Sequence, residues 1–395
     1  MQRLTSLAVI AGLLTAPIHA APKEKVAEAP KVLPSAIGYV PQDEDERGLW
    51  LQMDEYERDL KHSKQLIRDP ELNAYVRSVL CNTVGQDKCA ATRIYIMRTP
   101  YFNASMAPNG MMTVWSGLLL RVRNEAELAS VLGHEFGHFE YQHTLRLFKE
   151  IRKKTDAMAW LSLIPYGIGA IAQIGLAGSI FSFNRDMERE ADMKGLGYIA
   201  NAGYDPREAS AIWAQLRDEM DATALERNRK SKKDKNGGFF ATHPNTKERM
   251  EYLSIEAAKF DATTATRGEA EFNSVMFKWW PMLIDDQIML NDFGATEFLI
   301  GRLATNGWTP ELLFARGELY RNRNGTGDMA KALDFYNQSV AGNPNLAEAW
   351  RGLGIAQMKS GAYDAGQASL KQYLTMKPDA EDKALILMMA GGAGS

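Results

Sequence analysis

The pentapeptide His134-Glu135-Phe136-Gly137-His138 limits the fold and chemistry of this 395-residue chain more than any other stretch. On a helix, residues four apart differ by about 40° in azimuth, so the two imidazoles lie one turn apart on the same face. Such a pair can bind one metal ion, with the carboxylate of Glu135 beside it. A zinc ion with three protein ligands and an open fourth position activates water for attack on a carbonyl group. The motif therefore predicts zinc-dependent hydrolysis of peptide bonds.

The surrounding sequence predicts that this motif lies within one helix from Glu125 to Lys153. Asn124 and Glu127 are spaced as in a capping box, and apolar residues recur at helical spacing through the motif. On such a helix His143 would lie about 140° around the axis from His138. We therefore expect His143 to be a structural histidine and not a third metal ligand.

The third ligand is expected from a second helix. A histidine six residues after the second histidine would indicate a different class of metalloprotease, but Thr144 occupies that position. The best candidate stretch is Arg185 to Gly195, where Glu188 and Asp192 are four residues apart and share a helical face. One of these carboxylates could bind zinc while the other orients a ligand imidazole, or both could belong to a solvated acidic turn. Glu190 lies about 200° from Glu188 and is expected to point away from the site.

The order of several motifs resembles that of the CAAX-prenyl-protease-type zinc metallopeptidases. The similarity runs from about Arg93 to Leu253 and includes the pentapeptide, the run Glu188 to Asp192, and Thr242-His243-Pro244 followed by Arg249. It implies a zincin-like domain with one zinc ion per chain. The implied ligands are His134, His138 and Glu188, with Glu135 as the general base, Asp192 and Arg249 behind the ligands, and His243 stabilising an oxyanion or capping zinc in a resting state.

A strand and a hairpin are expected directly before the metal-binding helix. Thr92 to Met97 alternates like a strand, and Ala104 to Trp115 holds Pro108-Asn109-Gly110 between apolar arms. The resemblance implies that the strand at Asn103 and Ala104 is a sheet edge along which a peptide substrate is laid. An ordinary hairpin beneath the helix is the alternative, and both can hold.

Cys81 and Cys89 are the only cysteines and are separated by turn-like residues. In an exported protein they are expected to form a disulfide, which would stabilise the fold by about 2 to 3 kcal/mol on the chain-entropy model. A metal site is the weaker alternative, because no further cysteine or nearby histidine completes a ligand set.

The amino-terminal residues predict export to the periplasm. Residues 1–20 combine Arg3, an apolar run and small residues near Ala20, which is typical of a cleaved signal peptide. Residues 21–42 are rich in Ala, Pro and Lys and are expected to be a tether. The net charge of −3 points to no nucleic-acid partner.

Residues 157–184 contain no charged side chain. As a helix they are long enough to cross a bilayer, but a single span would place the two halves of the metal site on opposite sides of the membrane. We expect an apolar segment beside the cleft that contacts a membrane surface or an unfolded client, with buried core as the alternative. The basic run Arg227 to Gly238 is expected to be a flexible loop that tethers His243.

The fold class expected overall is α+β and mainly helical, in two parts. Residues 43–260 are expected to form the metalloprotease domain with a small sheet, and residues 261–395 a tetratricopeptide-like solenoid that binds a protein partner. The part order is similar to that of periplasmic members of the family. The leading hypothesis is a protease for unfolded or misassembled envelope proteins, and the alternative is a chaperone or scaffold with little proteolytic activity.

Overall fold

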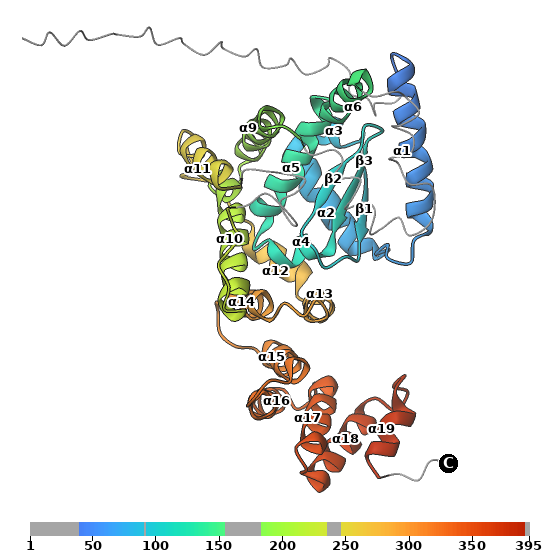
Figure 1. The fold of residues 1–395 in the computed structure, drawn as a ribbon, viewed down its shortest axis with the longest axis vertical. Coiled ribbons are helices and arrows are strands. Elements are labelled where there is room, and N and C mark those ends of the chain that lie inside the picture. Colours follow the sequence, from blue (N-terminus) through green and yellow to red (C-terminus); the bar gives the residue numbers. More distant parts are fainter. Residues whose placement is uncertain (1–38, 91, 155–182, 235–245, 392–395) are drawn as a thin grey trace, which may run out of the picture.

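The structure is a computed structural model that describes residues 39–90, 92–154, 183–234 and 246–391. It is mainly helical with one small sheet, which confirms the expected balance of secondary structure (Figure 1). The elements are α1 (Glu44–His62), α2 (Pro70–Val84), α3 (Gln86–Ala90), β1 (Arg93–Met97), β2 (Ala104–Met106), β3 (Met111–Trp115), α4 (Ser116–Arg121), α5 (Glu125–Glu140), α6 (His143–Lys154), α9 (Arg185–Asn201), α10 (Glu208–Glu226), α11 (Thr246–Ala257), α12 (Glu269–Met276), α13 (Trp280–Ile288), α14 (Phe293–Leu303), α15 (Pro310–Arg323), α16 (Asp328–Gly342), α17 (Ala347–Lys359), α18 (Tyr363–Met376) and α19 (Lys383–Met389).

The sheet contains the strand and the hairpin that the sequence predicts. Its strand order is β1-β3-β2, with β1 parallel and β2 antiparallel to β3. Gly110 closes the hairpin with a φ of 85°, a left-handed conformation that glycine adopts without strain. Since β2 is last in the strand order, it is an edge strand of this sheet.

Alternation along the strands distributes their side chains to two cores. Ile96, Met112 and Val114 join the main core, to which α2 and α5 contribute. Met97 and Met111 face the other way and pack with Leu60 of α1. Figure 1 accordingly shows α1 on one side of the sheet and α5 on the other.

The single helix expected from Glu125 to Lys153 is wrong, because the chain breaks it into α5 and α6. Asn124 caps α5 with a hydrogen bond from the Glu127 amide, as the capping pattern predicts. The break is at Gln142, which has a φ of 53° and cannot continue a right-handed helix. The break changes the direction in which the side chains after Glu140 point.

The expected disulfide is present, since Cys81 near the end of α2 is bonded to Cys89 in α3. Within the described ranges no helix is long and apolar enough to span a bilayer. The charge-free segment 157–184 lies outside the described residues except for its last two.

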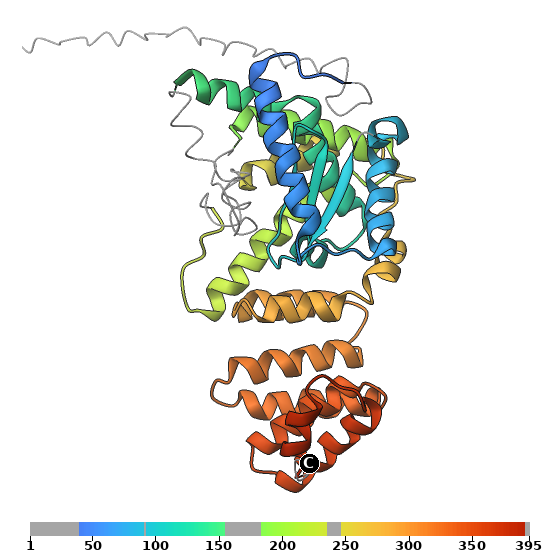
Figure 2. The same cartoon turned by 90° about the vertical axis from the view of Figure 1, so that its right-hand side faces the viewer.

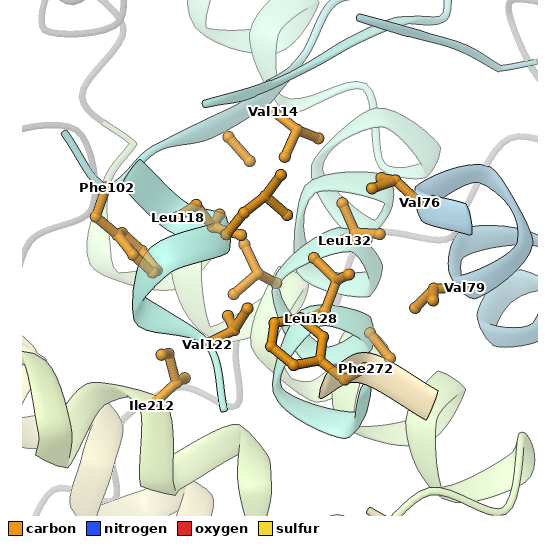
Figure 3. Close-up of a cluster of buried hydrophobic side chains, with 14 of the residues drawn as sticks. Val76, Val79, Phe102, Val114, Leu118, Val122, Leu128, Leu132, Ile212 and Phe272 are labelled. Carbon is orange, nitrogen blue, oxygen red and sulfur yellow. The ribbon is translucent and has the colours of Figure 1, made fainter. Parts of the chain in front are cut away.

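The hydrophobic core does not end at the domain boundary that the sequence suggests near residue 260. Phe272 of α12, Leu283 of α13 and Leu299 of α14 belong to the same buried cluster as Leu128 of α5. Figure 3 shows Phe272 and Leu128 together in that cluster. Helices α13 and α14, which fall within the solenoid that the sequence predicts from residue 261, are therefore packed on the core of the preceding domain.

Helices α15 to α19 follow one another as packed neighbours away from the sheet, as Figure 2 shows. Tyr336 of α16 is fully buried at the centre of this packing. A Cβ atom at Gly317 or at Gly352 would lie 2.5 Å from its ring, so both glycines are needed for α15 and α17 to approach α16.

Candidate metal centre

Helices α5 and α9 bring together the three side chains expected to bind zinc. The Nε2 atoms of His134 and His138 are 3.0 Å apart. Glu188 Oε2 lies 3.7 Å from the Nε2 atom of His134, and Glu188 Oε1 lies 3.6 Å from the Nε2 atom of His138. All three side chains are buried. In the described part of the chain they are the cluster of His, Cys, Asp and Glu donors that could hold a metal ion.

The donor set fits a zinc ion. Four tetrahedral ligands at about 2.0 to 2.1 Å from zinc lie about 3.3 Å from one another, and the three observed separations bracket that value. Two imidazoles and a carboxylate also match the donor chemistry of catalytic zinc sites, which keep a fourth position open for water or substrate.

Glycines set the close approach of the two helices that carry these ligands. A Cβ atom at Gly195 of α9 would lie 2.9 Å from the His134 amide nitrogen, and one at Gly137 would lie 3.0 Å from the Ala191 carbonyl oxygen. Both contacts are with backbone atoms, which cannot move aside as a flexible side chain can. The ligand-bearing faces of α5 and α9 can therefore meet only where these residues lack a side chain.

His134 is oriented from behind by Asp192 and Arg249. The Nδ1 atom of His134 lies 2.8 Å from Asp192 Oδ1, so Nε2 is left to face the metal position. Arg249 of α11 holds Asp192 with two hydrogen bonds of 2.7 and 2.6 Å and lies 2.7 Å from Glu188. Burial alone would raise the pKa of Asp192, but the charges of Arg249 and His134 outweigh burial and hold that pKa well below its usual range.

His138 is oriented through a second histidine, which the sequence analysis interpreted only as structural. The Nδ1 atoms of His138 and His143 are 2.8 Å apart, and His143 Nε2 lies 2.8 Å from Glu190. The helix break at Gln142 makes this possible, because a continuous helix would point His143 elsewhere. Glu190 was expected to point away from the site, and this is wrong, because its carboxylate contacts His143 and so supports His138.

The protonation of these groups follows from their neighbours. If His138 binds metal through Nε2, its Nδ1 carries the proton and donates to His143 Nδ1. His143 then carries its own proton on Nε2 and donates it to the Glu190 carboxylate, which also accepts from Arg146 at 3.0 Å. Burial lowers the pKa of His143 to about 4, which favours this neutral form.

The remaining expected site residues are placed as follows. Glu135 is buried on α5 next to His134, and Ala104 is buried at the start of the edge strand β2 with Asn103 just before it. His243 lies outside the described residues. The roles of all these residues remain predictions.

Comparison with known proteins finds a family that is similar to the part of the chain that carries this geometry. Residues 66–257 match the model of Peptidase family M48. This part of the chain is similar to peptidase family M48. The match includes both ligand-bearing helices and ends with α11, which carries Arg249.

Relatives of the M48 domain occur in bacteria and in mitochondria. The chain is 32% identical to the mitochondrial metalloendopeptidase OMA1 of Arabidopsis thaliana over 41% of its own length and 30% of the relative. It is 30% identical to the putative beta-barrel assembly-enhancing protease of Vibrio cholerae over 42% and 37% of the two chains. It is 28% identical to the corresponding Yersinia pestis protease over 52% and 46%. The matched region thus spans less than half of the length of each of these relatives.

Three residues that support the site were not assigned to it from the sequence, and one of them, Glu190, was expected to point away. Glu190 supports His143, Tyr252 donates a hydrogen bond to Asp192, and the ring of Trp213 lies 4.1 Å from the Arg249 guanidinium carbon. Tyr252 follows Arg249 by three residues on α11, a helical spacing that could have suggested a shared face. Trp213 lies on α10 and gives no such signal.

Proposed function

We propose that this chain is an exported zinc-dependent endopeptidase. His134, His138 and Glu188 hold one zinc ion, and Glu135 acts as the general base. The proposal depends above all on one observation: two buried imidazoles and a buried carboxylate converge within ligand distance of one another in the part of the chain that matches family M48. Zinc bound there supplies a Lewis acid that polarises the scissile carbonyl and lowers the pKa of water to about 7.

The residues of the chain contribute orientation and proton transfer. Glu135 accepts the proton of the attacking water and returns it to the leaving amine. Asp192 and the His143–Glu190 pair fix the rotation of the two imidazoles, so both Nε2 lone pairs point at one position. Arg249 balances the charge of Glu188 and keeps that carboxylate turned toward the histidines.

The free edge of β2 would bind the substrate backbone. The Trp115 amide donates to the Asn103 carbonyl and the Ala107 amide donates to the Met111 carbonyl, so the backbone groups of Ala104 and Met106 are turned away from β3. An extended peptide can hydrogen-bond to such groups with little dependence on its side chains. His243 would approach the same site, either to stabilise the oxyanion or to cap zinc in a resting state.

The biological role follows from the relatives and from the tail. Relatives named beta-barrel assembly-enhancing protease, together with the signal-like residues 1–20, favour a periplasmic protease for unfolded or misassembled envelope proteins. The paired helices from α15 to α18 are proposed to be tetratricopeptide-like and to recruit a protein partner. The apolar residues 157–184 would contact a membrane surface or the client.

A chaperone or scaffold with little proteolysis is the second candidate, favoured by the size of the helical tail relative to the site. A Glu135→Gln variant separates the two candidates. It should retain one zinc per chain and lose cleavage of an unfolded protein such as casein. The chaperone would instead be favoured if the wild type cleaves nothing and the Glu135→Gln variant protects unfolded proteins from aggregation as well as the wild type does.

A further inference from the structure

A hollow of about 390 Å³ lies along α10, outside the metal centre. Apolar side chains contribute much of its lining, among them Tyr101, Leu216, Met220 and Leu290. Arg121 supports its wall, because it pairs with Glu219 at 2.6 Å and donates to the Pro100 carbonyl at 3.1 Å. The hollow is therefore built on the fixed core.

The same face of α10 links this hollow to the metal centre. Trp213 lies on that face and contacts Arg249 of the metal centre. The ring of Trp213 also packs edge to face on Phe102, with 6.3 Å between the ring centroids, and Phe102 directly follows Tyr101 of the hollow. Met220 is seven residues further along α10, or about 10 Å at 1.5 Å per residue. An extended peptide rises about 3.3 Å per residue, so a substrate on the edge of β2 would reach the hollow about three to five residues from its scissile bond.

The rim of the hollow carries positive charge without matching negative charge. Its two carboxylates are already paired, Glu219 with Arg121 and Asp292 with Arg227. Three exposed cations complete the rim, and none of them forms an ion pair with another described residue. They are Arg229, Lys230 and Lys232.

These cations lie in the basic run that the sequence analysis expected to be a flexible loop, yet its described part is held on α10. Arg217 donates to the Lys233 carbonyl at 2.9 Å and to the Asp234 carboxylate at 2.7 Å. Lys233 in turn forms an ion pair with Asp221. The chain as a whole is slightly acidic, so this local excess of positive charge is a specific feature of the hollow.

We propose that the hollow binds an acidic stretch of the polypeptide substrate, about three to five residues from the scissile bond. This inference rests on the proposed peptidase function and names the substrate class that the site prefers. Tyr101, three residues before β2, lines the hollow, and the hairpin turn that follows β2 does not. The preference therefore applies to one side of the scissile bond. Apolar side chains between the acidic ones would contact Leu216 and Met220.

The test is a cleavage profile on a library of peptides of random sequence, with the cleaved bonds read by mass spectrometry. We expect Asp and Glu to be enriched at those positions on one side only. For a peptide pair made from the best-cleaved sequence, replacing three acidic residues by Gln or Asn should lower kcat/KM roughly 5- to 30-fold at low salt, and less at 0.5 M salt.

The matched variants remove three charges each. In the triple variant Arg229→Gln/Lys230→Gln/Lys232→Gln, the kcat/KM for the acidic peptide divided by that for the neutral peptide should be close to one. Lys64→Gln/Lys359→Gln/Lys371→Gln, which changes exposed lysines away from the hollow, should retain the wild-type ratio.

Four results would overturn the inference: no acidic preference in the wild type, equal preference on both sides, an unchanged ratio in the hollow variant, or an equal loss in the control. If the wild type cleaves neutral peptides with dependence on Glu135 but ignores acidity, only this inference fails. If it cleaves nothing, the proposed function fails. The hollow is then tested by labelling the acidic and the neutral peptide with a fluorophore and comparing their affinities for the Glu135→Gln variant.

Discussion

Replacing His143 with Ala should weaken zinc binding without removing any zinc ligand. In the structure His138 Nδ1 lies 2.8 Å from His143 Nδ1, and both side chains are buried. The variant leaves the N–H of His138 without its acceptor and lets the ring rotate. Loss of such a supporting contact typically costs 10- to 100-fold in metal affinity, or about 1.4 to 2.7 kcal/mol.

The assay is competition for zinc between the protein and a fluorescent chelator of known affinity. His143→Gln keeps a side chain that can accept from His138 and donate to Glu190, so it should recover part of the loss. His62→Ala, which removes an exposed histidine of α1, should bind zinc like the wild type. Circular dichroism of the apo proteins establishes that each variant is folded. A wild-type dissociation constant in His143→Ala would refute the role assigned to this contact.

Three further predictions concern the fold around the site. Gly195→Ala should weaken zinc binding or destabilise the domain by several kcal/mol, because the added Cβ atom would meet the backbone of His134. Gly197→Ala is the control: its Cβ atom would have nothing within 4 Å, so urea unfolding should show no change or a stabilisation of up to about 1 kcal/mol. Replacing Cys81 and Cys89 by Ser should lower the free energy of unfolding by about 2 to 3 kcal/mol, and an unchanged urea midpoint would contradict this. Burial alone would raise the pKa of Glu57, but hydrogen bonds from Arg93 and Tyr95 lower it to about 2 from 4.5. The Glu57 carboxylate therefore stabilises the fold above pH 4.5, and this contribution is lost as the pH falls toward 2, so Glu57→Gln should flatten the pH dependence of unfolding in that window by up to about 1.4 kcal/mol per pH unit.

The metal centre could be anticipated because helical periodicity alone fixes its first half. His134 and His138 are one turn apart on any helix, so their convergence needs no tertiary information. Glu188 is different, because spacing alone does not distinguish it from Asp192 as the ligand. The resemblance to a family supplied that choice, and the structure brings Glu188 nearer to the histidine Nε2 atoms while Asp192 contacts His134 from behind.

The support behind His138 could not be predicted because it depends on a break in a helix. The apolar pattern stays helical through His143, and Gln142 is not a residue type that signals a left-handed conformation. Once the helix breaks, His143 turns back to His138 and Glu190 of α9 meets it. The angular positions expected on an unbroken helix therefore predict the wrong neighbours for His143 and Glu190.

The extent of the core was also beyond the sequence. The change in composition near residue 260 suggested a boundary, but Phe272 and Leu299 fill the same core as Leu128. Such contacts join residues more than a hundred positions apart, and no local pattern in a single sequence encodes them.

The measurement that tests the metal site most directly is zinc content by elemental analysis of purified protein, wild type beside Glu188→Gln, with Glu297→Gln as a carboxylate control outside the site. We expect one zinc per wild-type and control chain and a greatly reduced content in Glu188→Gln after dialysis against a weak chelator. Full zinc retention in Glu188→Gln, or a wild-type protein that binds no zinc, would contradict the assignment of His134, His138 and Glu188 as the metal centre.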